Sequence, residues 1–536
     1  MSASSDRSRR KSNFVQHAAW LLCGNLLSRL LGLVRDLVLA ARFARRSTDV
    51  FFVAFTIPNS LRALLAEGAM SAAFVPLLSE AVAKEGHAEA QTRFRLFVGL
   101  MLTLSTVVAA LGIVGAPLLV YGYAAGYGVQ SEKFALTVQT TRWLFLYLPL
   151  IAWASVSAAA LHSQRRFIAA AFAPLSLNVA LVTAAWWPTQ LSPWRGDTAI
   201  LTLAVAAVLG GVLHFGLLLP ALGRAGFAFW PHFAWRAPIV QRARGLLIPL
   251  LAGLSVYQVN VMLSRLFASF LPDGAQSYLY YGQRLAEIPQ GMLAVAVAQA
   301  VMPELSAAHA SGDASKLAAL LGQSLGWVLY LALPASFFLL FCAEPTVTTL
   351  FGRGQFGPQD VAECARSLRM QALGVCGVAA SRTVVPLYHA SGDTRTPVRC
   401  SALNLVIFAA AAPLAMGPLD HAGIALATSL AAWTQLGALL WGLRRRLPQL
   451  PWRSLLGDLL RPLLSAALVM ATVAWWMTLG HWSAGGNHGR NLLVFAAGAL
   501  LALGLYLPLS GWLGCTQPRL LRARLGGKLQ QGSQRR

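Results

Sequence analysis

Residues 28–80 of the chain are SRLLGLVRDLVLAARFARRSTDVFFVAFTIPNSLRALLAEGAMSAAFVPLLSE, two apolar segments interrupted by charges. The charged residues inside these apolar segments are Arg29, Arg35, Asp36, Arg62 and Glu67. A charged side chain at the middle of a membrane costs about 2.5–3.5 kcal/mol on insertion scales, so it is tolerated mainly where it faces a polar cavity or a partner. The stretch therefore predicts a cationic, water-filled pathway within a helical membrane protein.

The composition of the whole chain supports a membrane location. Of its 536 residues, 57% are hydrophobic and only 12% are charged, whereas soluble domains average about 25% charged. The mean hydropathy is +0.59. Uncharged runs such as 491–514 exceed the roughly 20 residues that cross the hydrocarbon core. We expect an all-α polytopic membrane protein.

Fourteen spans are predicted from the apolar runs, at 13–41, 50–80, 95–121, 143–162, 167–187, 198–220, 245–270, 277–304, 323–343, 361–388, 398–416, 422–443, 460–479 and 491–513. The N-terminal tail and the even-numbered loops hold 26 Lys and Arg, the opposite loops hold 8, and the spans hold 9. By the positive-inside rule, this asymmetry places both termini in the cytoplasm. The net charge of +24 thus indicates membrane topology rather than nucleic-acid binding.

Short words recur at an offset near 227 residues and indicate an internal duplication. Phe74–Ser79 matches Val301–Ser306, Ala116-Pro117 matches Glu344-Pro345, and Leu177–Val179 matches Leu403–Leu405. Six spans per copy give two parallel repeats, and a substrate site is expected between such halves. The predicted division is a cytoplasmic N-tail (1–12), an N-lobe (13–220), a cytoplasmic connector (221–244), a C-lobe (245–445), spans thirteen and fourteen (446–513) and a basic cytoplasmic tail (514–536).

The charges within the spans are the candidate functional groups. Arg29 and Arg35 lie six residues apart, on different sides of one helix, so both can line a cavity only if the helix is broken, as Gly32 would allow, or if the cavity is wide. Arg62 and Glu67 follow Pro58, and Arg284 and Glu287 form an i,i+3 pair. Arginines outnumber carboxylates here, which favours an anion-binding cavity, because guanidinium groups pair with phosphate oxygens in bidentate fashion. Arg265 and Arg382 are further cations within spans.

Bond-making chemistry is not indicated. The sequence has no Walker A loop, no GxSxG and no HExxH. The six cysteines are scattered, with no CxxC, so neither a disulfide framework nor a zinc site is expected. We expect a transporter and not an enzyme, with no cofactor or metal, driven by a gradient, the membrane potential or consumption of its product.

Several motifs closely resemble those of the MurJ/MviN family, bacterial lipid II flippases of the multidrug/oligosaccharidyl-lipid/polysaccharide exporter superfamily. They are Ser28–Asp36, Thr48–Phe55, Ile57–Asn59, Ala66–Ala69, Ala73–Pro76, Arg166–Asn178, Tyr280–Pro289, Leu350–Gly354 and Gly392–Pro397. The resemblance covers nearly the whole chain.

The resemblance implies two pseudo-symmetric six-helix lobes around a cavity and two extra C-terminal helices that form a groove for a lipid tail. It places the family's essential residues on Arg29, Arg35, Asp49, Arg62 and Arg284. Asp36, Glu67 and Glu287 are expected to support them. Some relatives bind sodium in the second lobe, but no aspartate lies within spans seven, eleven or twelve here, so we do not expect that site.

The predicted function is movement of lipid II, an undecaprenyl-diphosphate-linked disaccharide-pentapeptide, across the bacterial cytoplasmic (inner) membrane by alternating access. This would place the chain in peptidoglycan biosynthesis, cell wall biogenesis and cell shape. Its expected partners are lipid II, membrane lipid and other cell-wall synthesis proteins. The alternatives are a flippase for another polyprenyl-diphosphate-linked glycan, a multidrug–cation antiporter of the same superfamily, or a non-transporting membrane scaffold.

Overall fold

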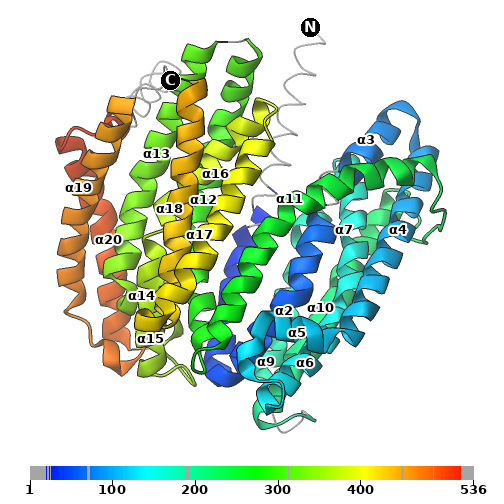
Figure 1. The fold of residues 1–536 in the computed structure, drawn as a ribbon, viewed down its shortest axis with the longest axis horizontal. Helices are drawn as coiled ribbons and strands as arrows, with labels where there is room; N and C mark the ends of the chain where they lie inside the picture. Colours follow the sequence, from blue (N-terminus) through cyan, green and yellow to red (C-terminus); the bar gives the residue numbers. More distant parts are fainter. Residues whose placement is uncertain are drawn as a thin grey trace, which may run out of the picture. The chain divides into compact units, whose positions relative to one another are not determined.

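The computed structural model describes residues 20, 23–24, 26–68, 73–187, 193–311, 313–447, 452–486 and 488–520. All regular secondary structure in these residues is helical (Figure 1), which confirms the predicted fold class. The predicted N-tail, residues 1–12, and most of the predicted basic tail, 514–536, lie outside the described residues.

The chain divides into two compact units, and the boundary along the sequence lies between Gln276 and Ser277. Unit 1 begins with a helix at residues 26–42. Its other helical elements are α2 (Arg45–Arg62), η1 (Ala63–Gly68), α3 (Val75–Lys84), α4 (His87–Val114), α5 (Ala116–Ala124), η3 (Ala125–Tyr127), α6 (Glu132–Phe145), α7 (Tyr147–Ser163), α8 (Ile168–Phe172), α9 (Leu175–Trp186), η4 (Gly196–Ile200), α10 (Leu201–Arg224) and α11 (Pro238–Ser269).

Unit 2 contains nearly all of α12 (Ala275–Ala310) and everything that follows. Its other elements are α13 (Ala314–Phe341), α14 (Ala343–Phe351), α15 (Pro358–Ala372), α16 (Val375–Ala390), α17 (Arg395–Leu419), α18 (His421–Arg446), α19 (Trp452–Met477), η5 (Trp482–Ala484) and α20 (Gly489–Trp512).

The helix pattern of unit 1 recurs in unit 2, as the repeated sequence words predict. The 28-residue α4 is followed by the nine-residue α5, and the 28-residue α13 by the nine-residue α14. Both pairs start 227 residues apart, at His87 and Ala314 and at Ala116 and Ala343. The pairs α6/α15 and α7/α16 keep offsets of 226 and 228 residues. Two copies of one helix order therefore underlie the fold.

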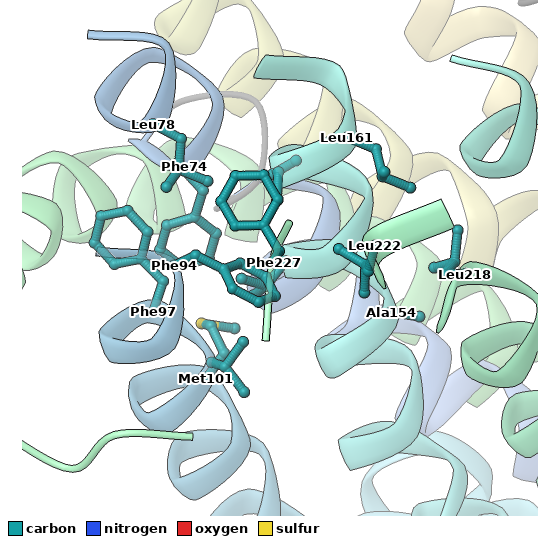
Figure 2. Packing of buried hydrophobic residues seen from close by; sticks show 14 of the residues in the cluster. Phe74, Leu78, Phe94, Phe97, Met101, Ala154, Leu161, Leu218, Leu222 and Phe227 are labelled. Carbon is teal, nitrogen blue, oxygen red and sulfur yellow. The ribbon is translucent and has the colours of Figure 1, made fainter. Parts of the chain in front are cut away.

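The core of unit 1 is aromatic at one end of its helices. Phe74 packs on Phe97 with ring centroids 4.8 Å apart, and Phe94 packs on Phe227 at 5.1 Å. Figure 2 shows these rings converging above Met101, with Leu161, Leu218 and Leu222 alongside. The cluster joins α3, α4, α7 and α10 to the chain segment that follows α10. Full burial of such side chains contributes about 1.5–3 kcal/mol each.

In unit 2 the two C-terminal helices pack on α13 and on each other. The Tyr506 hydroxyl of α20 donates to the Tyr330 carbonyl oxygen at 2.7 Å, and the Tyr330 hydroxyl lies 2.8 Å from Ser510 Oγ. Both tyrosines are buried. Because buried polar groups require partners, these bonds fix α20 along α13.

Nine helical segments within the described residues are long and apolar enough to cross a membrane, or ten when a bent pair is counted. That pair is Pro358–Ala372 with Val375–His389, bent by 43°, so the predicted span 361–388 is kinked. The helices α2, α11 and α12 are not among the nine, and all three carry charged residues. The count of fourteen spans stays a prediction.

Helix ends and loops of unit 1 contact one another in two groups, one for each predicted face of the membrane. Loops predicted on one face meet through Ser47 Oγ to Asp197 (3.1 Å) and Lys133 Nζ to Asp273 (2.6 Å). Loops predicted on the opposite face meet through Arg242 to Glu80 (3.1 Å) and through the His87 ring, 3.2 Å from the Gly226 carbonyl oxygen. This alternation is what successive crossings of a membrane require.

Candidate functional site

The first helix presents its two arginines on different sides, as their spacing predicts. Arg29 is exposed, whereas Arg35 is only 8% exposed. The suggested break at Gly32 is absent, because residues 26–42 form one continuous helix. Gly32 itself is buried. A straight helix therefore cannot turn both guanidinium groups toward the same side.

Arg35 is held by two buried partners. Its Nε and Nη2 donate to Asp36 Oδ1 at 2.9 and 2.7 Å, and its Nη1 donates to Asn178 Oδ1 at 3.2 Å. Asp36 is fully buried. Asp36 thus pairs with Arg35, and Asn178 of α9 adds an anchor that the sequence did not indicate.

Arg29 has a different environment. It is exposed on a helix whose neighbouring side chains Leu26, Leu30 and Val34 are also exposed. Within the part of the chain that the structure describes, no side chain or carbonyl forms a hydrogen bond or ion pair with Arg29. None of the described residues therefore occupies its five guanidinium N–H groups.

Arg62 ends α2 next to a distortion of the helix. Its Nε donates to Asn59 Oδ1 at 2.8 Å, and the side chain is half-buried. Pro58 lies within the last turn of α2, and the π-helical η1, which contains Glu67, follows at once. A proline removes one backbone hydrogen bond, and π-helical turns frequently occur at functional sites.

Arg284 and Glu287 lie together on α12 in unit 2, as predicted from their spacing. Arg284 Nη1 is 3.7 Å from Glu287 Oε2, and both side chains are partly exposed, at 29% and 37%. Glu287 also accepts a hydrogen bond from Gln283 at 3.0 Å. At this distance and exposure the ion pair is weak.

Asp49 lies in a buried ionic cluster near the start of α2. The carboxylate is 1% exposed, and its Oδ2 accepts from Lys133 Nζ at 3.2 Å and from the Gly274 backbone N–H at 2.7 Å. Lys133 also donates to Asp273 at 2.6 Å. The cluster joins α2, α6 and the segment between α11 and α12. Gly274 adopts a φ of +104°, a conformation that side chains other than glycine rarely accept.

An aromatic ring lies under the lysine of this cluster. Lys133 Nζ is 4.1 Å from the centroid of the Tyr127 ring, within cation–π range. Burial, with a smaller effect from the charge of Asp49, raises the pKa of the Tyr127 hydroxyl well above its usual value. The phenol therefore stays neutral and contributes its ring face, not a charge.

Two further arginines within predicted spans, Arg265 and Arg382, differ from each other. Arg265 is buried and exchanges hydrogen bonds with Gln276: Nη1 donates to the Gln276 carbonyl oxygen at 3.2 Å, and Gln276 Nε2 donates to the Arg265 carbonyl oxygen at 2.7 Å. Arg382 is exposed on α16. Arg265 thus joins α11 to the start of α12, which is a structural role.

The sequence analysis missed Lys133, Asp273 and Asn178. Each makes its bond to a residue far along the chain: 84 residues separate Lys133 from Asp49, 140 separate it from Asp273, and 143 separate Asn178 from Arg35. One signal for Lys133 was available in the sequence. The Asp49 carboxylate borders an apolar segment and needs a cation, and Lys133 lies at the start of another apolar helix.

The candidate site residues described above are arginines, one lysine and carboxylates. No group of three or more His, Cys, Asp and Glu that could hold a metal ion occurs among the described residues. The six cysteines are free, and five of them are buried. Arg35 and Asp49 are bonded to neighbours that fix their positions, whereas Arg29 is exposed and Arg62 and Arg284 are partly exposed.

Comparison with known proteins gives one consistent family. A family model described as "Lipid II flippase MurJ" matches residues 40–489. The chain is 33% identical over 476 residues to the probable lipid II flippase MurJ of Vibrio cholerae, covering 87% of this chain and 90% of the relative. It is also 33% identical over 459 residues to the lipid II flippase MurJ of Burkholderia cenocepacia, covering 85% and 88%.

Solved structures show a similar fold. The chain matches a lipid II flippase MurJ in an inward closed conformation with a TM-score of 0.75 and 22% identity, over 90% of this chain and 97% of that one. It matches an inward-facing multidrug transporter of the MATE family with a TM-score of 0.65 and 15% identity, over 79% and 95%. At these identities the structures bear on fold alone.

Proposed function

This chain belongs to the lipid II flippase MurJ family, and we propose that it moves lipid II from the inner to the outer leaflet of the bacterial inner membrane by using arginines within its helices to bind the diphosphate. The observation that carries this proposal is Arg29, exposed on an apolar helix with no partner among the described residues. An unpaired guanidinium within a membrane is costly unless it meets an anion.

The substrate-binding groups are Arg29 and Arg62 from unit 1 and Arg284 from unit 2. Arg62 and Arg284 lie on predicted spans two and eight, which are equivalent in the duplicated sequence, and each is proposed to pair with phosphate oxygens of the substrate. Bidentate pairing of guanidinium with phosphate oxygens gives the geometry as well as the charge. Arg35 and Asp49 act indirectly, because Asp36 with Asn178 and Lys133 with Gly274 already hold them.

The membrane potential supplies a driving force in this account. Moving one negative charge outward gains about 2.3 kcal/mol per 100 mV. The diphosphate moves while bound to the protein's cations, and the polyprenyl chain stays in lipid. No bond is made or broken.

A multidrug–cation antiporter shares the fold but fits the charges less well. Such a protein needs acidic groups to bind cationic drugs, whereas Asp36 and Glu287 each accompany an arginine and Asp49 accompanies Lys133. Across the predicted spans, which hold nine Lys and Arg, basic residues outnumber carboxylates, which favours an anionic substrate.

Depletion of the protein in its own cells tests the proposal. Lipid II is expected to accumulate in the inner leaflet, and a second copy of the gene is expected to clear it. Accumulation of a different polyprenyl-linked glycan would assign the other flippase function, and no accumulation of any precursor would favour the scaffold.

A further inference from the structure

The segment between α10 and α11, residues 225–237, is pinned along α4; we refer to it as the connector strap. Gln91 of α4 accepts from the Ala228 N–H at 3.0 Å and donates to the Ala228 carbonyl oxygen at 3.2 Å. Arg95 Nε donates to the Trp230 carbonyl oxygen at 3.2 Å, and the His232 N–H donates to the Arg95 carbonyl oxygen at 2.9 Å. The strap is therefore an ordered element.

Close packing fixes the strap further. A Cβ atom at Gly99 would lie 2.2 Å from the His232 carbonyl oxygen, so only glycine permits this approach of the two backbones. Leu96 and Leu100 of α4 form a buried cluster with Val240 of α11, and Ala234 and Ala237 of the strap pack against it. The strap thus runs beside the part of α4 where the helix becomes continuously apolar.

Three aromatic side chains of the strap are nevertheless exposed. Trp230 is 63% exposed, Phe233 55% and Trp235 46%, and the rings of Phe233 and Trp235 stack with centroids 6.3 Å apart. Phe227, at the start of the same strap, is buried in the core of unit 1. A cluster of exposed aromatics on a fixed backbone marks an interaction surface or a membrane contact.

The charges around these rings are almost all positive. Residues 223–245 contain four arginines and no Asp or Glu. Arg242 is paired with Glu80. Arg224, Arg236 and Arg244 are exposed, and none of them forms an ion pair within the described part of the chain. The neighbouring acids Glu85 and Glu89 are both paired with Arg93.

We propose that the connector strap binds anionic phospholipid, with Trp230, Phe233 and Trp235 at the level of the headgroups and Arg224, Arg236 and Arg244 on the phosphates. Tryptophan prefers the boundary between membrane and water, and arginines near an anionic leaflet contribute favourably to binding. The proposal is independent of the transported substrate. In this proposal the connector strap holds the C-terminal end of α10 and the N-terminal end of α11 at the same depth in the membrane.

A binding measurement tests the charge component. The intact protein, stripped of lipid in detergent, is titrated with phosphatidylglycerol and with phosphatidylcholine, and bound lipids are counted by native mass spectrometry. Phosphatidylglycerol is expected to bind more tightly. The variant R224Q/R236Q/R244Q should weaken its binding by about 10-fold or more, with no change in folding.

The matched control removes three exposed arginines from loops predicted on the other face, as R142Q/R195Q/R490Q. This variant is expected to retain wild-type affinity within about twofold, because its changes lie in loops predicted on the opposite face of the membrane from the strap. Equal loss in both triple variants, or no loss in either, would overturn the assignment.

A depth measurement tests the aromatic component. With Cys23 replaced by serine, a nitroxide is placed at His232→Cys in the strap or at Gln130→Cys in a loop on the other face, and the protein is reconstituted in nanodiscs. The strap label should be relaxed by oxygen and shielded from a water-soluble nickel chelate, while the label at 130 should show the reverse. Free access of the chelate to position 232 would show that the strap projects into water and would exclude the proposal.

Discussion

Arg29 and Arg35 show how two arginines in one helix can differ in role. Arg29 is exposed and available, whereas Arg35 is buried and bonded to Asp36 and Asn178. The sequence predicts their separation, because six residues correspond to about 600° of helical rotation. It does not predict which of them is buried, because burial depends on α9, which packs nearby only after folding.

Replacing Arg29 by alanine should abolish support of growth without reducing membrane insertion. Lysine at the same position should restore only part of the function, because an ammonium group keeps the charge but loses the planar fork that pairs with phosphate oxygens. Growth complementation at matched protein levels is the measurement. Full activity of R29A would remove Arg29 from the binding site, and R195A, in an exposed loop, should behave like the wild type.

Replacing Arg35 by alanine should act on stability. It leaves Asp36 buried without its cation, which costs about 3–5 kcal/mol. Thermal unfolding in detergent should show a clear loss for R35A and substantial recovery for R35A/D36N, in which the carboxylate is neutral. If the double variant remains as unstable as R35A, the pair with Asp36 is not what holds this helix.

The ionic cluster of Asp49, Lys133 and Asp273 connects three elements of unit 1. Asp49 was identified only through a family resemblance, and its partners were not identified at all. The reason is physical: helix periods and apolar runs report which face is buried, but not which distant side chain meets a buried charge. By contrast, the duplicated helix order was readable, since repeated words such as Leu177–Val179 and Leu403–Leu405 lie along the chain itself.

Replacing Lys133 by methionine should loosen the segment between α11 and α12. The change removes the lysine ammonium group from the buried Asp49 carboxylate, at a cost of about 3–5 kcal/mol. Hydrogen exchange should rise at residues 271–276, and K133M/D49N should reverse part of that rise. D273N is the control, because Asp273 is half exposed and its loss should cost about 1 kcal/mol or less. Unchanged exchange in K133M would show that the cluster does not hold this segment.

Considered as a whole, the molecule confirms the predicted all-α fold and the repeat of one helix order in two units. Kinks were less predictable. The bend of 43° between α15 and α16 lies in a run that appears as a single apolar span in the sequence. Gly374, between the two helices, packs closely against Ser429 of α18, since an added Cβ atom would lie 2.7 Å from Ser429 Oγ. Hydropathy alone does not reveal this contact.

Topology gives a prediction about orientation. A cysteine at Ala228, in the connector strap, should react with an impermeant maleimide only after cells are permeabilised, because the N-terminal tail and the loops of that face together carry 26 of the basic residues and should be cytoplasmic. A cysteine at Gln130, on the other face, should react in intact cells. Cys23 is replaced by serine in both. Labelling at 228 in intact cells would reverse the orientation.

The central claim is that arginines within the helices bind the substrate's diphosphate and are not merely structural ion pairs. Arg284 allows a direct test, because its neighbour Glu287 lies 3.7 Å away and is already bonded to Gln283. The measurement is lipid II flipping by R284A, E287A and R284A/E287A at matched membrane levels. We expect R284A and the double variant to be equally inactive, because the substrate's charge stays unpaired in both. Recovery of flipping in the double variant would show that Arg284 serves only to neutralise Glu287 and would contradict the account.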